Sequence, residues 1–523
     1  MPRLAPVASV RAPNALVTTV DQLATQAGVA MLRAGGSAAD AAVAANAVLA
    51  VTAQHSCGMG GDLFAVVGQA HDEPIVLNAS GRAGSGADPE RLRAEGATRM
   101  PVRGDIRAVP VPGCVDGWLA LHERFGKLPR AAVLEPARAY AELGFPASPL
   151  LAGALATLTI DCREAFVLDG PLRPGVRLRR PGVARALEAI IRDGRDGFYR
   201  GEFGEELLRM GKGEYVADDL ARAHADWVPP LHVHAWGHDV WTAPPNSQGY
   251  LTLASAGIAD GLALPHDPDD PQWAHLLVEA AKQAGWDRPQ VLHEHADGEA
   301  LIAPQRLEAR RKAIDPERAA TLPAPASPSG TMHLNAADRD GLIVSLTQSN
   351  AAGFGAHLVA VGIFLQNRGI GFSLAPGHPA EYGPGRRPPH TLCPTLVTLD
   401  GAVRYGLGTM GADSQPQVLL QLLARLLVAG EEPADAVAAA RWILAAPSGD
   451  TFATWEQPHG VRVRVERHAP TAWIEGLRER GHDVEEIDAF AYVAGHAHVL
   501  AIEDDHFAGA SDPRALSAAA AGY

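Results

Sequence analysis

A threonine that could become a new chain terminus is the residue with the greatest chemical potential in this sequence. Thr331 follows Gly330 at the end of a proline-rich stretch, TLPAPASPSG, over residues 321–330. This stretch has no periodicity, so we expect an exposed connector. If the bond before Thr331 breaks, one residue carries both a hydroxyl nucleophile and an α-amine, whose reference pKa of about 8 lets it act as general base. Taken alone, an ordinary strand threonine that follows a loop explains the same residues.

The residues after Thr331 predict a β-hairpin. Residues 331–349 read TMHLNAADRDGLIVSLTQS. The pair Asp340-Gly341 is a strong turn signal between an extended segment and the β-rich run from Leu342 to Thr347. Ser349 lies eighteen residues after Thr331 on the predicted return strand. The predicted hairpin therefore places Thr331 and Ser349 on neighbouring strands.

The chain resembles the gamma-glutamyltransferase family over nearly its whole length. The resemblance runs from NALVTTVDQLATQAGVAMLRAGGSAADAAVAANAVLAV at residues 14–51 to GASDPRALSAAAAGY at residues 509–523, and the run around Thr331 looks like the start of the family's small subunit. These enzymes are N-terminal-nucleophile hydrolases that are made as one chain and cut themselves. The resemblance implies an α+β fold, a four-layer αββα sandwich. It also implies one globular unit made of a large subunit, residues 1–330, and a small subunit, residues 331–523. Whether two such heterodimers associate stays open.

The resemblance assigns catalytic roles to three residues besides Thr331. Ser349 matches a hydroxyl residue that contacts the nucleophile. Gly411 and Ala412, in GTMGAD, match two glycines whose N–H groups stabilise the tetrahedral oxyanion. A methyl group at Ala412 leaves its N–H in place, so two preorganised donors are still expected there. The methyl group would matter only if the position required a positive φ.

Arg82 and Asn350 are candidates for substrate binding. Arg82, in NASGRAG, matches the arginine with which the family grips the α-carboxylate of its substrate. A planar guanidinium forms two parallel hydrogen bonds to such a group. Asn350 directly follows Ser349 and is the second candidate.

The positions that would hold a substrate α-ammonium group differ from those of the transferases. Residues 365–373 read LQNRGIGFS, so Arg368 and Gly371 stand where the family places ammonium-binding residues, an acidic one among them. His390 and Thr391 replace a serine pair and are further substrate-binding candidates. A guanidinium close to an ammonium group weakens binding. These changes resemble the divergent branch that includes oxamate amidohydrolase, which acts on acyl amides without a free α-amine.

The other predicted elements favour a layered sandwich over a doubly wound parallel sheet, because strands and helices are grouped rather than alternating. We expect capped helices over 21–33 and 37–51, mainly helical segments over 115–225 and 271–318, and a helix from Gln415 to Val428. We expect strands after the Gly-rich turn at 55–61, at 74–79, within 231–256, and at 331–347, 357–367 and 393–406.

Composition and charge argue against several kinds of partner. The net charge is −15, with no dense run of lysine or arginine, which argues against nucleic acid and anionic membranes. The first residues, MPRLAPVASVRAPNALVTT, contain no apolar segment typical of a signal peptide, and Ala41 to Ala53 is too short to span a bilayer. The four cysteines include no CxxC pair. We therefore expect a cytoplasmic enzyme without a membrane partner.

Two cofactor motifs compete with this interpretation. Gly406, Gly408 and Gly411 form a GxGxxG pattern, but ADSQPQ rather than a helix follows the third glycine. Histidine pairs occur at 232 and 234, 293 and 295, and 496 and 498, and no cysteine or carboxylate completes a ligand set at standard spacing. We expect neither a metal nor an organic cofactor.

The predicted function is an autoprocessing threonine amidohydrolase for small amides that bear a carboxylate, with oxamate-type substrates favoured and Arg82 and Arg368 as carboxylate anchors. One alternative is a gamma-glutamyl hydrolase or transferase that acts on glutathione-like amides. A second is an unprocessed homologue that only binds a ligand or partner. A third, a nucleotide-dependent oxidoreductase, would rest on the glycine pattern alone.

The position of Thr331 predicts the products of cleavage. Purified protein should run on a denaturing gel as two fragments, residues 1–330 and 331–523. Thr331→Ala should stay as one chain because it lacks the hydroxyl that attacks the preceding carbonyl. A wild-type chain that stays intact through long incubation and still hydrolyses amides would contradict the N-terminal-nucleophile mechanism.

Overall fold

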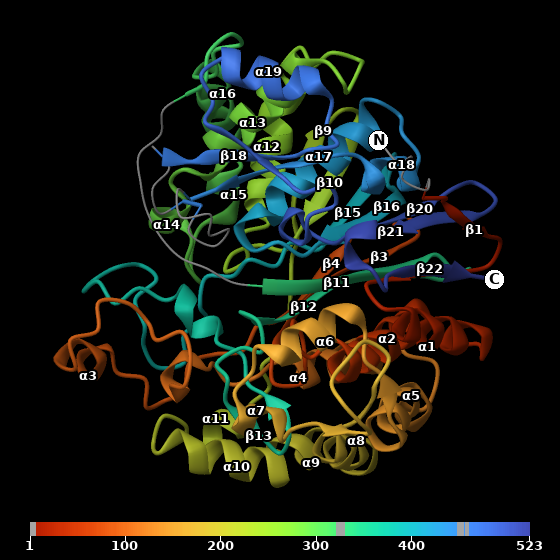
Figure 1. The fold of residues 1–523 in the computed structure, drawn as a ribbon, viewed down its shortest axis with the longest axis vertical. Coiled ribbons are helices and arrows are strands. Elements are labelled where there is room, and N and C mark those ends of the chain that lie inside the picture. The colour runs from red at the N-terminus through yellow and green to blue at the C-terminus, as the bar shows by residue number, and fades with distance from the viewer. Residues whose placement is uncertain (1–6, 321–329, 447–453, 456–459) are drawn as a thin grey trace.

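Two seven-stranded sheets form the centre of the molecule in the computed structural model, which describes residues 7–320, 330–446, 454–455 and 460–523 (Figure 1). Sheet I has the order β1 (Val10–Ala12), β21 (Phe507–Ser511), β20 (Ala497–Ile502), β16 (Ala402–Thr409), β15 (Thr395–Leu399), β10 (His238–Thr242), β9 (Leu231–Ala235). Sheet II has the order β22 (Ala519–Gly522), β2 (Leu16–Thr19), β11 (Gly330–Ala337), β12 (Leu342–Ala351), β3 (Asp62–Gln69), β4 (Ile75–Ala79), β8 (Asp226–Val228). Neighbouring strands in both sheets are antiparallel.

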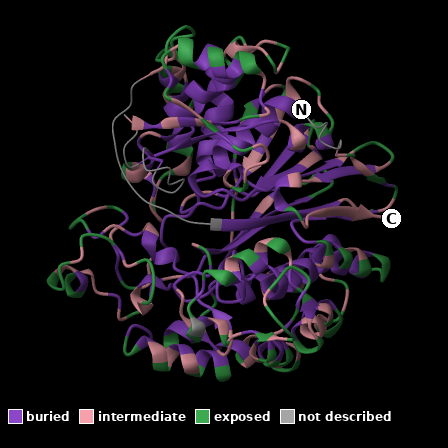
Figure 2. Ribbon diagram, viewed as in Figure 1, coloured by how far each residue is buried: buried purple, intermediate pink, exposed green. Residues whose placement is uncertain are grey.

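Helices cover the outer face of each sheet, which completes four layers. Helices α1 (Gln22–Arg33) and α2 (Ala38–Thr52) pack on sheet II, whereas α12 (Tyr250–Asp260) and α17 (Gln415–Leu427) pack on sheet I. Helix α13 (Pro271–Gly285) packs on α12 and α17. Figure 1 shows the two helical layers on opposite sides of the sheets, and Figure 2 shows mainly buried residues in the sheets and in the helices that lie against them. A third apolar cluster fills the space between the sheets and includes Leu16, Phe64, Ile343, Leu396 and Leu500. The predicted αββα sandwich is confirmed.

Helix α2 shows why an alanine-rich segment can lie inside this sandwich. Each of its fifteen residues is buried, and its small side chains let the helix pack closely against sheet II. Ser37 caps its first turn by accepting the N–H of Asp40, and the Asp40 carboxylate accepts the N–H of Ser37 in return. This reciprocal pair satisfies two donors that a helix start leaves without partners. The predicted cap at Ser37 is thereby confirmed.

The predicted hairpin at Asp340-Gly341 is also confirmed. Strands β11 and β12 pair antiparallel on either side of this turn. Gly341 has φ 84°, a left-handed conformation that favours glycine. The Asp338 carboxylate accepts the N–H groups of Asp340 and Leu342 and fixes the turn.

Shorter elements surround the sandwich. The remaining helices are α3 (Pro89–Ala94), α4 (Cys114–Phe125), α5 (Arg130–Leu143), α6 (Pro149–Ala156), α7 (Ile160–Arg163), α8 (Pro181–Asp193), α9 (Arg195–Tyr199), α10 (Glu202–Gly211), α11 (Ala217–Ala221), α14 (Arg288–Val291), α15 (Gly298–Leu301), α16 (Pro304–Lys312), α18 (Pro433–Ala438) and α19 (Thr471–Glu479). The remaining strands are β5 (Phe145–Pro146), β6 (Val167–Leu168), β7 (Arg177–Arg179), β13 (Val359–Ala360), β14 (Ile363–Phe364), β17 (Trp442–Ala445), β18 (Arg462–Glu466) and β19 (Val484–Ile487). Among the helices of the described ranges, none combines the length and apolar character that crossing a membrane requires.

Three sequence predictions about individual elements need correction. The segment 393–406 is two strands, β15 and β16, because Asp400 and Gly401 adopt positive φ and form a tight turn. Residues 250–256 belong to helix α12 rather than to a strand, since their buried side chains continue along a helix after Gly249. The segment 357–367 contains only two short strands, β13 and β14. Of the predicted connector, residues 321–329 lie outside the described residues.

Candidate active site

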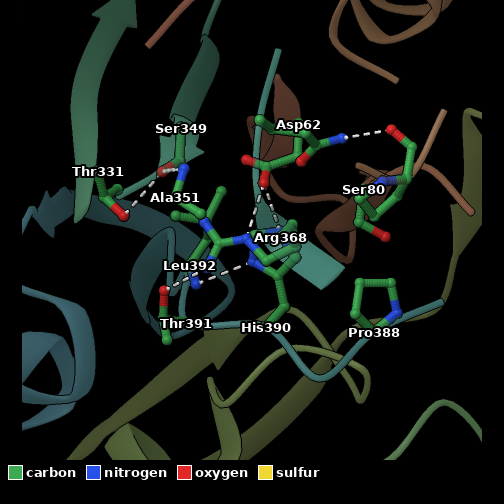
Figure 3. A network of polar contacts seen from close by, with 12 residues as sticks. Asp62, Ser80, Thr331, Ser349, Ala351, Arg368, Pro388, His390, Thr391 and Leu392 are labelled. Carbon is green, nitrogen blue, oxygen red and sulfur yellow. Dashed lines mark hydrogen bonds and ion pairs between the residues drawn. The ribbon is translucent and has the colours of Figure 1, made fainter. Parts of the chain in front are cut away.

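Three neighbouring strands of sheet II bring Thr331, Ser349 and Asp62 to one end of the sheet (Figure 3). The register of the β11–β12 pair shifts between residues 330 and 332, so Ser349 and Asn350 both lie opposite Thr331. Such a β-bulge re-aims side chains at the rim of a sheet. On the other side of β12, Ser349 pairs directly with Asp62, the first residue of β3. Each of these three side chains is at most 1% exposed.

The hydroxyl of Thr331 is held by two polar side chains. Thr331 Oγ1 lies 3.4 Å from Ser349 Oγ, and the side-chain amide of Gln415 donates to Thr331 Oγ1 at 3.1 Å. The N–H of Ala351 donates to Ser349 Oγ at 2.8 Å and fixes that hydroxyl in turn. Because an amide N–H can only donate, Thr331 Oγ1 accepts from Gln415 and directs its own hydrogen toward Ser349. The threonine therefore has a defined rotamer and a defined hydrogen direction.

The Gly-rich turn before β3 allows this close packing. A Cβ on Gly61 would lie 2.0 Å from the carbonyl oxygen of Ser349, which no side chain tolerates. The turn therefore brings Asp62 against β12 only because residue 61 is glycine.

The loop at the end of β16 presents the candidate oxyanion donors. The carbonyl of Met410 accepts the Thr409 hydroxyl at 2.7 Å, and the carbonyl of Gly411 accepts the N–H of Ser414 at 2.9 Å. In a planar trans peptide the next N–H points the opposite way, so the N–H groups of Gly411 and Ala412 point away from these contacts. Both residues line a cavity of about 400 Å³. Their role as oxyanion donors stays a prediction.

Ala412 occupies a backbone conformation that favours glycine. Its φ is 59°, in the left-handed region, so the condition under which the methyl group matters is met. A residue with a Cβ loses roughly 1 kcal/mol or more in this region. The hydrogen bonds around the loop stabilise this conformation, since Gln248 donates to the carbonyl of Ala412 at 2.9 Å.

Arg368, His390 and Thr391 surround the Asp62 carboxylate. Arg368 Nε donates to Asp62 Oδ2 at 2.9 Å, and Arg368 Nη1 donates to Thr391 Oγ1 at 3.1 Å. His390 Nε2 lies 2.9 Å from the same Asp62 oxygen, as Figure 3 shows. His390 Nδ1 accepts the N–H of Leu392 at 3.3 Å, which places the ring proton on Nε2, facing Asp62. The sequence predicts each of these three residues as a substrate-binding residue, and the structure brings them together around Asp62, while their contact with substrate stays a prediction.

Burial and charge determine the protonation of this cluster. Burial alone would raise the pKa of Asp62, but Arg368 and His390 outweigh it and lower that pKa below its usual value. Burial, together with the neighbouring Arg368, lowers the pKa of His390 to about 4. Near neutral pH the cluster therefore consists of one anion, one cation and a neutral imidazole.

Arg368 has an acidic partner that its own segment of the sequence does not show. Asp62 supplies that partner from another strand, and Arg368 is only 1% exposed. The absence of a side chain at Gly371 has a packing reason, because a Cβ there would lie 2.5 Å from the carbonyl oxygen of Pro389. The backbone at Gly371 therefore packs directly against the segment that leads into His390.

Arg82 and Asn350, the other predicted substrate-binding residues, make contacts outside the cluster around Asp62. Arg82 pairs with Glu294 and with Asp226, and its guanidinium also donates to the carbonyl of Gly385. The side-chain amide of Asn350 donates to the carbonyl of Gln54 at 3.3 Å. A role in substrate binding stays a prediction for both Arg82 and Asn350.

The glycine pattern lies in a strand, and a group of metal-ligand side chains lies apart from the histidine pairs of the sequence prediction. Gly406 and Gly408 lie inside strand β16, where a Cβ on Gly408 would clash with the ring of His333 at 2.2 Å. Within the described ranges, one group, His275 with Glu279 and His482, has metal-ligand side chains close together. Lys282 donates into that group, to Glu279 at 2.8 Å and His482 at 3.1 Å. With the Lys282 ammonium group in this position, the four side chains form a hydrogen-bonded network.

Comparison with known proteins identifies the family. The family model for gamma-glutamyltranspeptidase matches residues 24–522. The chain belongs to this family. Members of the gamma-glutamyltranspeptidase family act on amide bonds, and this chain shares their N-terminal-nucleophile hydrolase fold.

Three relatives of this gamma-glutamyltranspeptidase-family chain are similar over nearly their whole length. An oxamate amidohydrolase proenzyme of Klebsiella pneumoniae is 36% identical over 523 residues, 96% of this chain and 97% of the relative. A glutathione hydrolase-like YwrD proenzyme of Bacillus subtilis is 34% identical and covers 98% of this chain and 99% of its own. The crystal structure of a cephalosporin acylase from Bacillus halodurans superposes with a TM-score of 0.90 at 32% identity, covering 100% of this chain and 98% of its own.

Sequence reasoning missed three residues of the site in this family member. Asp62 lies in GMGGD, and a carboxylate directly after a Gly-rich turn at a strand start is a usable signal. Gln415 lies three residues after Ala412 at the first position of α17. Gln248 donates to the carbonyls of both Thr391 and Ala412, and no local pattern in the sequence indicates this contact.

The contact between Gln415 and Thr331 predicts the behaviour of a variant. Gln415→Leu should lower kcat by about tenfold, because one hydrogen bond that orients the nucleophile is lost, with KM little changed. Steady-state kinetics on the cleaved protein measure this. Gln421→Leu is the matched control, since Gln421 lies on the same helix and its amide donates to backbone carbonyls. It should lower Tm rather than kcat, and a wild-type kcat for Gln415→Leu would contradict the proposed contact.

Proposed function

We propose that this protein is an autoprocessing amidohydrolase that uses Thr331 as its N-terminal nucleophile. Cleavage after Gly330 divides it into a large subunit, residues 1–330, and a small subunit, residues 331–523, which stay together as one unit. The observation that carries the proposal is the orientation of Thr331 Oγ1 between Ser349 and Gln415. The names of its relatives, an oxamate amidohydrolase proenzyme among them, support both the processing and the amide chemistry.

The chemistry needs few groups. The free α-amine of Thr331 accepts the hydroxyl proton, and Oγ1 attacks the carbonyl carbon of the amide. The N–H groups of Gly411 and Ala412 stabilise the negative oxygen of the tetrahedral intermediate. The ammonium of Thr331 returns the proton to the departing amine as the C–N bond breaks. The same amine then deprotonates a water molecule, which releases the acid from the ester on Oγ1.

The acyl half of the substrate fits the cluster formed by Arg368, His390 and Thr391. A carboxylate on the acyl group gains from the positive guanidinium and the threonine hydroxyl. Asp62 is already bound by Arg368 and approached by His390, so it neutralises the guanidinium rather than an incoming ammonium. We therefore assign small amides with a carboxylate and no free α-ammonium, oxamate-type compounds among them, as the preferred substrates.

One observation favours a second candidate, a gamma-glutamyl hydrolase or transferase. Asp62 Oδ1 is buried and accepts no hydrogen bond from the described part of the chain. A substrate ammonium could donate to that oxygen. The proposal that the protein only binds a ligand lacks such support, because the oriented Thr331 would then have no use.

A comparison of two substrate classes decides between these candidates. Cleaved wild-type protein should show a kcat/KM for oxamate at least about tenfold above that for a gamma-glutamyl anilide, because Arg368 already binds the Asp62 carboxylate that would pair with an ammonium. Thr331→Ala, measured in parallel, gives the rate without nucleophile and should turn over neither compound. Faster turnover of the gamma-glutamyl compound would overturn the assignment and favour the second candidate.

A further inference from the structure

No part of the substrate has yet been assigned to the cavity of about 400 Å³ beside the candidate oxyanion loop. Gly411 and Ala412 form part of its wall, and so does Ala351, whose N–H binds Ser349. The cavity therefore opens beside the point at which Thr331 would meet the carbon of an amide. Ligand sites in proteins have volumes of roughly 300 to 1,000 Å³, so this cavity has room for a ring with substituents.

Much of the cavity wall is apolar and aromatic. Phe354, from the segment after β12, is 2% exposed, and Leu150 and Ala154 of α6 stand at the same cavity. Tyr492 is 41% exposed, although its ring packs edge-on against His496 at 4.7 Å. An exposed aromatic face inside a concave site is a surface that an apolar ring can cover.

The wall carries basic side chains and no acidic one. Arg103 is exposed and forms no ion pair or hydrogen bond with any residue of the described ranges. His357 stands near it, and the lining contains no aspartate or glutamate. His55 is only 6% exposed, and neither of its ring nitrogens has a hydrogen-bond partner in the described part of the chain. This wall suits an anion at Arg103 and a polar atom beside His55.

We propose that this cavity holds the amine half of the amide and takes an amine whose apolar ring carries a carboxylate or similar anion. The inference rests on the proposed function, which assigns the acyl half to Arg368, His390 and Thr391. Gln248 binds the carbonyls of Thr391 and Ala412, so this one side chain links that cluster to the wall of the cavity. In this arrangement the ring packs against Tyr492 and its anion faces Arg103.

A series of amides with one acyl group tests the proposal. The substrates are oxamate, its N-phenyl derivative and its N-(4-carboxyphenyl) derivative, each given to the cleaved enzyme. The kcat/KM should rise in that order. In Arg103→Gln the ratio of carboxyphenyl to phenyl substrate should fall by about tenfold, the value of one charge-assisted hydrogen bond. Arg173→Gln, at an exposed arginine outside the lining, is the matched control and should keep the wild-type ratio.

The outcomes separate the inference from the proposed function. Turnover of oxamate that exceeds that of both aryl amides, or an unchanged ratio in Arg103→Gln, would overturn the amine subsite and leave the nucleophile in place. If none of the three amides is hydrolysed, the proposed function fails. In that case calorimetric titration of 4-aminobenzoate still decides about the cavity. Binding about tenfold tighter to wild type than to Arg103→Gln supports the subsite, and equal or absent binding overturns it.

Discussion

The site depends on the way in which strand β12 pairs with both of its neighbours. The bulge opposite β11 places two residues of β12 against Thr331, and the regular pairing with β3 sets Asp62 directly beside Ser349. The regular register of the rest of the hairpin, with Met332 opposite Gln348, already places Ser349 opposite Thr331, and the bulge adds Asn350 beside it. The pairing of β12 with both neighbours therefore brings the nucleophile, its hydroxyl neighbour and the buried carboxylate to the same end of sheet II.

A buried ionic cluster is the second constraint. Removing Asp62, Arg368 and His390 from water costs free energy, and their mutual contacts offset that cost only while all three are present. The cluster joins three distant parts of the chain: the start of β3, the segment after β14 and the loop before β15. Gln248 links the last of these to the oxyanion loop. The groups proposed to recognise the acyl half are thus held rigidly with respect to the groups proposed for the chemistry.

Local features of the sequence predicted much of the fold. The Asp340-Gly341 turn, the cap at Ser37 and the start of α17 each depend on a few adjacent residues, and the structure has all three. The turn at Asp400-Gly401 was equally local and was overlooked. Asp62, Gln415 and Gln248 could not be placed in this way, because their roles depend on sheet register and on contacts between segments far apart in the chain. The positive φ of Ala412 likewise follows from the loop around it rather than from the residue type.

The central claim is that the acyl group of the substrate is transferred to Oγ1 of Thr331. Rapid acid quenching of the cleaved enzyme during turnover of an oxamate-type amide, followed by mass spectrometry, tests it most directly. The account predicts a transient mass increase equal to the acyl group on the fragment 331–523, which peptide fragmentation assigns to Thr331. An acyl group on any other residue, or on the fragment 1–330, would contradict the account.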